Sequence, residues 1–504
     1  MCGAPVGWIP LKQRTLEGSV LVIAGQCTGP PKARAPAQAP DGAGPGRARS
    51  AGSGQARSAG PGRRGAGAAR GGRASATICA MSTRAPLRVA VLGAGTVGGS
   101  VVRAFLERPD KLAPFDGARL VLAGVAVRDM AKARARGIPP GLLADAPAHL
   151  VADPEIDIIV ELMGGDEPAR TLIAAALGAG KSVVTANKHV IAHHGPELEA
   201  IARRSGGALR FEAAVGGGIP ILSPLAADLA ANTVSRVRGI VNGTTNFILT
   251  AMGELGQPYD EVLAEAQANG YAEADPRGDV EGDDAANKVV LLARLAFGRW
   301  VDPASVLRTP PSVRGWGRPG ITGVTSAEME GAGFLGLAMK LLAVAQPSSV
   351  DRIEATVLPT AVPANGALGG TDGVLNRIEV RGDPIGNVSF SGPGAGGDAT
   401  SSAVIGDLLA IARRCGSTWA GLAPAGETPV VANVADPFAV ARPWFAFLPG
   451  ISPEGVELGE TAAIEEIEGG TVVRTGPLPL ERARTAIAPH LPDGVDVTLY
   501  PVTD

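Results

Sequence analysis

The stretch LRVAVLGAGTVGGSVVRAFLER, residues 87–108, constrains the fold of this chain more than any other segment. An apolar strand runs into a glycine-rich turn, and a helix opens directly behind the turn. Gly93 allows the tight turn, Gly95 lets a pyrophosphate approach the backbone, and Gly98 lets the helix pack against the strand. The free N–H groups at the start of the helix would face the anion. The segment therefore predicts the first strand and helix of a dinucleotide-binding α/β domain.

The end of the second predicted strand, RLVLAGVAVRD at 119–129, indicates which dinucleotide binds. An acidic residue at this point holds a free ribose 2′-hydroxyl, whereas an arginine suits a 2′-phosphate. Here Arg128 is followed by Asp129 and, close behind, by Lys132. We therefore expect NADP(H) to be favoured, with NAD(H) still possible through Asp129. The alternative is that Arg128 is a surface residue at the end of a strand.

Strands and helices alternate up to about residue 210, and later strands follow one another more closely. IDIIVELMGG (156–165) and the segment ending at Thr185 predict buried strands of a parallel sheet, and Lys188 follows at the sheet edge that binds ligands. RIEATVLPT, GVLNRIEVRG and IGNVSFSG predict strands of a mixed sheet. The predicted fold class is α/β, with a Rossmann-type domain (86–210), an α+β domain with a mixed sheet (211–414) and a small α+β C-terminal segment (415–504).

The beginning of the chain differs in composition from the rest. The first 80 residues are rich in Gly, Ala, Pro, Ser and Arg and carry 11 Lys/Arg against 2 Asp/Glu. Such a segment buries too little apolar surface to offset the entropy of ordering. We expect a disordered leader over 1–85 and translation that begins at Met81, with a signal or transit peptide as the alternative.

The remaining residues predict the partners and the compartment. They hold 35 basic and 47 acidic side chains, a formal net charge of −12, which argues against nucleic-acid binding. The apolar run at 19–25 is too short to span a membrane. Of the four cysteines Cys415 alone lies beyond the leader, so we expect neither a disulfide framework nor a cysteine metal site. We expect a cytoplasmic protein that acts on a small molecule.

Two further glycine-rich turns each join a predicted strand to a predicted helix. In FEAAVGGGIPIL (211–222) the glycines suit a turn whose backbone carbonyls converge, and a plain strand–helix turn is the alternative. GPGAGGDATSSAV (392–404) is a glycine loop ahead of a helix, and it can close over a bound cofactor.

The segment GYAEADPRGDVEGDDAANK, residues 270–288, crowds six carboxylates ahead of one lysine at the start of an apolar helix. One interpretation is a solvated acidic loop that caps the helix, since aspartates accept bonds from free N–H groups there. Asp284 and Lys288 lie one helical turn apart, so a structural ion pair is also compatible. Beside a hydride cofactor, however, a lysine can protonate the alkoxide of a carbonyl reduction, and carboxylates suit a cationic substrate group.

Six segments occur in this order along the chain: GAGTVG, TANK, FEAAVGGGIPI, NGTTNFIL, GYAEADPRGDVEGDDAANK and GPGAGGDAT. Together they closely resemble homoserine dehydrogenase over about residues 87–414, and the 270–288 segment is highly specific. The resemblance implies the reversible NAD(P)H-dependent reduction of L-aspartate 4-semialdehyde to L-homoserine, on the route to threonine and methionine. It also implies a homodimer or a dimer-based oligomer, with 211–414 as the catalytic, substrate-binding and dimerisation domain.

The resemblance also assigns site residues position by position. Lys288 matches the general acid/base, and Lys188 matches a lysine at the nicotinamide and substrate end of the cofactor site. Glu273 and Asp284 match residues that bind homoserine, and we add Asp279 of the same loop. Together with the glycine loop and Arg128, the expected cofactor contacts are Gly93, Ala94, Gly95, Thr96, Val97, Gly98, Arg128, Gly164, Lys188, Gly270 and Gly396. The residues that match a monovalent-cation site for Na⁺ or K⁺, made mostly of backbone carbonyls, are Glu212, Val215, Gly217 and Ile219.

The sequence departs from the family pattern in two places. No aspartokinase-sized domain lies ahead of the dinucleotide domain, so we expect a monofunctional enzyme. Residues 426–504 predict a strand, a hairpin, a helix and a strand, which is an ACT-like order without its first helix. We therefore expect no inherited threonine feedback.

Two other functions compete with this interpretation. An acylating semialdehyde dehydrogenase needs a nucleophilic cysteine, for which Cys415 would have to serve. A catalytically silent NAD(P)-sensing or amino-acid-binding regulator would be marked by loss of Lys188 or Lys288, and both are present.

Overall fold

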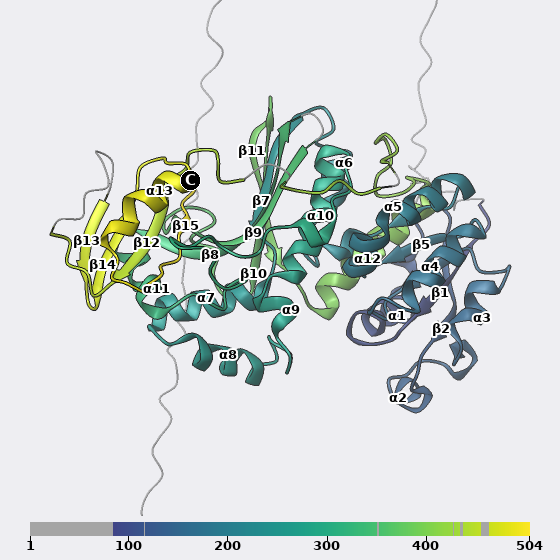
Figure 1. The fold of residues 1–504 in the computed structure, drawn as a ribbon. Coiled ribbons are helices and arrows are strands. Elements are labelled where there is room, and N and C mark those ends of the chain that lie inside the picture. The colour runs from purple at the N-terminus through teal and green to yellow at the C-terminus, as the bar shows by residue number, and fades with distance from the viewer. Residues whose placement is uncertain (1–83, 115, 350–351, 427, 434–436, 455–462) are drawn as a thin grey trace, which may run out of the picture. The chain divides into compact units, whose positions relative to one another are not determined.

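The dinucleotide half is built on a six-stranded parallel sheet. The computed structural model describes residues 84–504 apart from 115, 350–351, 427, 434–436 and 455–462 (Figure 1). The predicted leader lies outside the described residues up to residue 83. The strand order is β3-β2-β1-β4-β5-β6, and the predicted parallel α/β architecture is confirmed. The strands are β1 (Leu87–Leu92), β2 (Leu120–Ala126), β3 (Leu143–Ala144), β4 (Ile158–Glu161), β5 (Ser182–Thr185) and β6 (Leu209–Arg210).

Helices cover this sheet, and one of them comes from far along the chain. The nearby helices are α1 (Thr96–Glu107), α2 (Met130–Ala135), α3 (Pro147–Ala152), α4 (Ala169–Gly178) and α5 (Lys188–Ser205). Helix α12 (Gly397–Ala412) packs against α1, with Val404 and Leu408 in the same buried cluster as Val91 and Val101. The predicted boundary at 210 therefore leaves out α12, which packs with the dinucleotide half.

The second domain contains a five-stranded sheet that differs from the expected mixed sheet. Its order is β11-β10-β7-β8-β9, and every neighbouring pair is antiparallel. Short connections join β8 to β9 and β10 to β11, and short connections of this kind form hairpins, because a parallel pair needs a long crossover. The strands are β7 (Thr233–Ile240), β8 (Leu337–Ser349), β9 (Arg352–Pro363), β10 (Leu375–Asp383) and β11 (Gly386–Pro393).

Helices α7, α10 and α11 pack against this sheet, and α10 also contacts α5 of the dinucleotide half. The apolar residues Val289, Leu291 and Leu292 of α10 are fully buried, which explains why the lysine among them is also drawn inside. The helices are α6 (Leu222–Ala226), α7 (Gly243–Leu255), α8 (Tyr259–Ala268), α9 (Arg277–Val280), α10 (Asp283–Phe297) and α11 (Ser326–Phe334). Short 3₁₀ helices lie at Pro109–Leu112, Pro140–Leu142, Glu212–Ala214, Pro303–Ser305 and Ala488–His490. Within the described residues, none of the helices combines the length and apolar character that a membrane span requires.

The C-terminal segment forms a third, four-stranded sheet in the order β13-β14-β12-β15, with antiparallel neighbours. The predicted succession of strand, hairpin, helix and strand is present. Residues 455–462, in the connection where an ACT-like first helix would lie, are outside the described residues. The elements are β12 (Trp444–Pro449), β13 (Ala463–Ile467), β14 (Gly470–Arg474), α13 (Leu480–Ile487) and β15 (Tyr500–Pro501).

A buried carboxylate joins α5 to α10. Arg294 of α10 donates to the two oxygens of Glu199 at 3.0 and 2.7 Å, and Trp300 Nε1 donates to the same carboxylate at 2.7 Å. Glu199 is 3% exposed and Arg294 is fully buried. Burial alone would raise the pKa of Glu199, but the bonds from Arg294 and Trp300 outweigh it and lower the pKa. The carboxylate is therefore charged and holds the two helices together.

We predict that Glu199→Gln lowers the free energy of unfolding by about 3–5 kcal/mol, because it leaves Arg294 buried without a charged partner. Urea denaturation measures this change. Glu197→Gln is the matched control on the same helix, since Glu197 is 42% exposed in its pair with Arg170. An exposed pair contributes about 0.2–1 kcal/mol, so similar losses in the two variants would contradict the prediction.

Candidate active site

The glycine turn after β1 opens a cavity of about 590 Å³ at the carboxyl edge of the parallel sheet. A Cβ on Gly93 would approach the Leu162 carbonyl oxygen to 2.7 Å, and one on Gly98 would approach the Gly93 carbonyl oxygen to 1.9 Å. A Cβ on Gly95 would meet nothing within 4 Å, which leaves open space for a ligand. These surroundings fit a dinucleotide. The predicted residues that line the cavity are Gly93, Ala94, Gly95, Thr96, Arg128 and Gly164.

Basic side chains gather at the β2 end of this cavity. Arg128 and Lys132 both line it, as the sequence suggested, and Arg136 joins them. Arg136 Nη1 donates to the Ala94 carbonyl oxygen at 3.0 Å, a contact that sequence reasoning missed. Asp129 Oδ1 instead accepts from Lys132 N at 2.8 Å and caps α2. The cavity thus presents three cations, while Asp129 is engaged with a helix end, and Asp145 and Glu167 also line the cavity.

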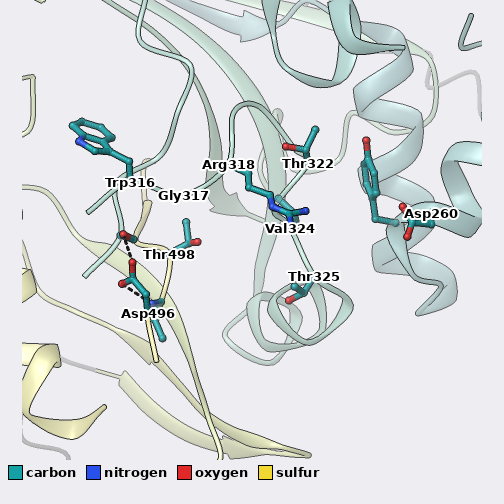
Figure 2. A pocket seen from close by; sticks show the side chains of 13 residues that line it. Asp260, Trp316, Gly317, Arg318, Thr322, Val324, Thr325, Asp496 and Thr498 are labelled. Atoms are coloured by element: carbon teal, nitrogen blue, oxygen red, sulfur yellow. Dashed lines mark hydrogen bonds between the residues drawn. The ribbon is translucent and has the colours of Figure 1, made fainter. Parts of the chain in front are cut away.

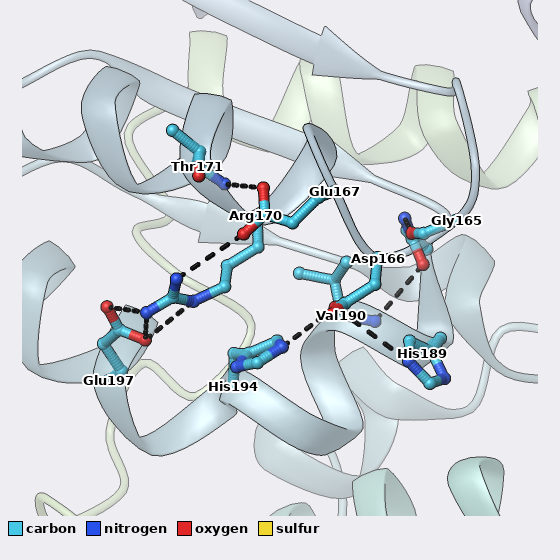
Figure 3. A network of polar contacts seen from close by, with 10 residues as sticks. Gly165, Asp166, Glu167, Arg170, Thr171, His189, Val190, His194 and Glu197 are labelled. Carbon is cyan, nitrogen blue, oxygen red and sulfur yellow. Dashed lines mark hydrogen bonds and ion pairs between the residues drawn. The ribbon is translucent and has the colours of Figure 1, made fainter.

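A polar network joins the loop after β4 to the start of α5 (Figure 3). Asn187 accepts from Val190 N at 3.2 Å as the cap of α5, and its Nδ2 donates to the Gly165 carbonyl oxygen at 2.7 Å. Asp166 lies 2.9 Å from His194 Nε2. These contacts fix the first turn of α5, and therefore the position of Lys188, relative to the loop that lines the dinucleotide cavity.

A second cavity of about 580 Å³ lies between the start of α5, the start of α10 and the glycine loop ahead of α12. It brings together predicted residues from both halves of the molecule. Cys415, by contrast, is exposed and lines neither this cavity nor the first. The predicted residues that line the second cavity are Val97, Lys188, Gly217, Gly270, Asp279, Asp284, Lys288 and Gly396.

Asp284 lies between two lysines in this cavity. Lys188 Nζ is 2.9 Å from Asp284 Oδ1, and Lys288 Nζ is 2.6 Å from Asp284 Oδ2. Asp284 raises the pKa of Lys188 more than burial lowers it. Burial alone would raise the pKa of Asp284, but the two lysines outweigh it and hold this pKa well below its usual range. One charged carboxylate therefore fixes two ammonium groups that come from different domains.

Asn242 completes the arrangement, and the sequence had not indicated it. Its Nδ2 donates to Asp279 at 2.7 Å and to Asp284 at 2.9 Å, while its Oδ1 accepts from Thr245 N at 2.9 Å. Asn242 is the N-cap of α7. An asparagine directly ahead of an apolar helix is the N-cap signal that identifies it. Burial raises the pKa of Asp279, and the hydrogen bond from Asn242, which lowers this pKa, does not offset the effect of burial.

Glu273 differs from the other predicted substrate-binding residues. Its side chain is exposed and does not line the cavity, although its charge contributes to the raised pKa of Lys188. Tyr271, two residues earlier, does line the cavity, and Thr244 Oγ1 donates to its carbonyl oxygen at 2.7 Å. The acidic loop thus places its backbone beside the cavity and Glu273 at the rim.

The turn after β6 carries the predicted cation-site residues. The Glu212 carboxylate accepts from the backbone N–H groups of Ile221, Leu222 and Ser223 at 2.7–2.8 Å and so is occupied by the start of α6. The carbonyl oxygens of Val215, Gly217 and Ile219 lie in buried residues and accept no hydrogen bond from the described part of the chain. Buried carbonyls need a partner, and such oxygens suit a hard cation. The turn therefore fits a monovalent cation held by backbone oxygens.

A third cavity, of about 690 Å³, lies away from these residues (Figure 2). It is lined by the start of α8, by parts of the 312–325 segment with Trp316 and Arg318, and by residues 496–498. None of the predicted site residues lines it.

Comparison with known proteins identifies similar chains. The family model described as homoserine dehydrogenase matches residues 220–409, and the one described as homoserine dehydrogenase, NAD binding domain, matches residues 93–212. The homoserine dehydrogenase of Mycobacterium tuberculosis is 46% identical over 332 residues, which cover 65% of this chain and 73% of that protein.

Solved structures of homoserine dehydrogenases are also similar to this chain. A homoserine dehydrogenase from Thiobacillus denitrificans has a TM-score of 0.73 at 34% identity, over 83% of this chain and 98% of that one. A hyperthermophilic archaeal homoserine dehydrogenase in complex with NADPH has a TM-score of 0.53 at 26% identity, over 64% of this chain and 97% of that one.

We predict that Asp284→Asn lowers the pKa of Lys188, because the charge that raises this pKa is removed while burial, which lowers it, remains. Competitive labelling with an amine-selective reagent across pH, followed by mass spectrometry, measures the midpoint. The curve for Lys188 should move to lower pH in the variant. Lys132, exposed and in the other cavity, is the internal reference. An unmoved Lys188 midpoint would show that Asp284 does not control its charge.

Proposed function

Because the chain belongs to the homoserine dehydrogenase family, we propose that Lys288 and Lys188 carry the family's reaction in the cavity between α5 and α10. The protein is an NAD(P)-dependent oxidoreductase that acts on a CH–OH group. Its reaction interconverts L-aspartate 4-semialdehyde and L-homoserine in amino-acid biosynthesis. The observation that supports the site most directly is the single carboxylate, Asp284, that holds both lysines in one cavity.

Lys288 is the proposed proton donor. An ammonium group has three N–H donors, and Lys288 directs two of them to the Val241 carbonyl oxygen and to Asp284, each at 2.6 Å. The third remains for a substrate oxygen in the cavity. The bound nicotinamide supplies the hydride when the semialdehyde is reduced. The alkoxide that develops must then be protonated, and a charged lysine aligned by two acceptors can do this.

Lys188 is the proposed partner in charge stabilisation. Its raised pKa keeps it an ammonium group at neutral pH. Its side chain is 39% exposed, whereas that of Lys288 is 11% exposed, so Lys188 lies nearer the mouth of the cavity. From there it can attract the carbonyl oxygen or the carboxylate of the substrate. Lys288, which is deeper and held by two acceptors, is better placed to transfer a proton at a defined position.

Carboxylates are proposed to bind the other end of the substrate. Both the semialdehyde and homoserine carry an α-ammonium group, which needs an anionic partner. Asp279 and Asp284 line the cavity, but Asp284 is already shared between two lysines. Asp279 and the rim residue Glu273 are therefore the proposed ligands of the ammonium group.

NADP(H) is the proposed preferred cofactor, with NAD(H) as the possible second. Arg128, Lys132 and Arg136 line the end of the cavity where a ribose 2′-phosphate would lie, and Asp129 is engaged as a helix cap. The archaeal relative in complex with NADPH is consistent with this preference. Gly93, Ala94, Gly95, Thr96 and Gly164 would hold the phosphates and riboses, while Val97, Lys188, Gly270 and Gly396 would surround the nicotinamide.

Further features of the family are proposed for this chain. The backbone oxygens of the 215–219 turn would hold Na⁺ or K⁺ and so rigidify the wall of the substrate cavity. A cytoplasmic homodimer or dimer-based oligomer is proposed, and exposed apolar residues beside and on the β10–β11 hairpin, Leu375 and Ile385 among them, support association. The proposed domains are 86–210 together with α12, 211–396, and 415–504. The last is proposed to be a degenerate ACT-like segment that does not confer strong inhibition by threonine.

We predict that Lys288→Ala folds normally, binds NADPH and loses about 10²–10⁴ in kcat, the contribution of a positioned acid/base. Glu273→Ala should instead mainly raise the KM for homoserine, because Glu273 would bind substrate without taking part in proton transfer. Steady-state kinetics, with Tm measured alongside, separates these effects. A Lys288→Ala enzyme with near-normal kcat would refute the assignment and leave Lys188 as the stronger candidate.

We predict that Arg128→Ala raises the KM for NADP(H) far more than the KM for NAD(H), because only the former carries the 2′-phosphate. Kinetics with each cofactor at saturating homoserine measures the two effects. Arg134→Ala is the matched control, since Arg134 lies on α2 but does not line the cavity. Equal effects of Arg128→Ala on the two cofactors would show that this residue does not recognise the phosphate.

A further inference from the structure

Asn376 on β10 is a buried amide without partners. Its side chain is fully buried, and neither Oδ1 nor Nδ2 has a hydrogen-bond partner in the described part of the chain. An amide offers two donors and an acceptor with two lone pairs. Because buried polar groups in native proteins are nearly always paired, an unpaired amide calls for a partner, and a changed backbone, a bound ligand or a water can supply one.

The amide of Asn376 lies directly beneath the glycine loop ahead of α12. The backbone of Asn376 pairs with Gly392 of β11. A Cβ on Gly394 would come within 2.1 Å of Asn376 Nδ2, so the loop can lie this close only because residue 394 is glycine. Gly394, Ala395 and Gly396 line the substrate cavity, and Gly396 is the cap of α12.

The loop itself is also short of partners. The N–H groups of Gly394, Ala395 and Gly396 donate to no acceptor in the described part of the chain. The loop is also close to the turn after β6, since a Cβ on Gly217 would come within 2.6 Å of the Gly394 carbonyl oxygen. The loop thus lies close to both Gly217 and Asn376, and its three N–H groups and the amide of Asn376 are unpaired in the described part of the chain.

We propose that Asn376 is a positioning residue whose amide hydrogen-bonds the backbone of Gly394–Gly396 when this loop closes over bound NAD(P)H. The proposal rests on the assignment of this loop to the cofactor site. Asn376 lies under the loop and does not itself touch the cofactor. A bound cofactor favours the closed arrangement of the loop. In that arrangement the amide of Asn376 gains its hydrogen-bond partners, so cofactor binding and the pairing of the amide are coupled.

The test is Asn376→Leu, which keeps the size of the side chain and removes its hydrogen bonds. Because the cofactor-free protein leaves this amide unpaired, the Tm of the variant without cofactor should be unchanged or higher. The dissociation constant for NADPH, measured by nucleotide fluorescence, should rise about tenfold. Hydrogen exchange of a peptide spanning 393–397 should lose the protection that NADPH confers on the wild type. Asn387→Leu is the matched control, since Asn387 is exposed on β11 of the same hairpin.

Each outcome decides between the alternatives. A lower Tm with wild-type NADPH affinity and wild-type loop protection would show that Asn376 is merely structural. Wild-type protein that binds NADPH without protecting 393–397 would also overturn the inference and would remove this loop from the cofactor site. Failure of the wild type to bind either cofactor would instead contradict the proposed function. If Asn376→Leu does not fold, Asn376→Ser, which is smaller and cannot span the gap, should show the same losses of affinity and protection.

Discussion

The buried carboxylate of Glu199 fixes the relation between the two halves of the enzyme. It receives bonds from Arg294 and Trp300 and so joins α5 to α10. Lys188 begins α5 and Lys288 lies in the second turn of α10, so the separation of these two lysines depends on this helix pair. A buried ion pair contributes little net stability compared with apolar packing, but it strongly disfavours arrangements in which either charge loses its partner. Its contribution here is therefore to the specificity of the packing.

In the cavity between α5 and α10, too, one carboxylate holds cationic side chains from two helices. Two ammonium groups in one cavity repel each other, and Asp284, which pairs with both, adds an attraction to each. Asn242 donates a third hydrogen bond to Asp284 and connects it to Asp279. The five side chains come from the start of α5, the cap of α7 and the acidic segment before and within α10. A shift of any one of these helices would therefore change the pKa values of side chains on the others.

The sequence predicted the features that depend on local spacing. The strand–glycine–helix pattern located the dinucleotide cavity, and the i,i+4 relation placed Asp284 beside Lys288. The pairing of Lys188 with Asp284 joins residues far apart in the chain, so no spacing rule contains it, and only the family resemblance placed both in one site. The prediction of a mixed second sheet was wrong, because apolar alternation identifies strands without indicating how they pair. Arg136 was missed because its bond to the Ala94 carbonyl oxygen joins segments far apart in the chain. The capping role of Asn242 is local, but its bonds to Asp279 and Asp284 depend on tertiary packing.

Unpaired polar groups gather around the glycine loop ahead of α12. The carbonyl oxygens of the 215–219 turn lie on one side of the loop, and the amide of Asn376 lies beneath it. Elsewhere an unpaired buried group only destabilises the fold. Here a cation would supply partners for the carbonyl oxygens, and a dinucleotide would lead to partners for the amide. Binding of each would therefore increase the local stability of the loop and the turn. The wall of the substrate cavity would then be most rigid when both are bound. Binding of these groups would thus be coupled to the order of the site.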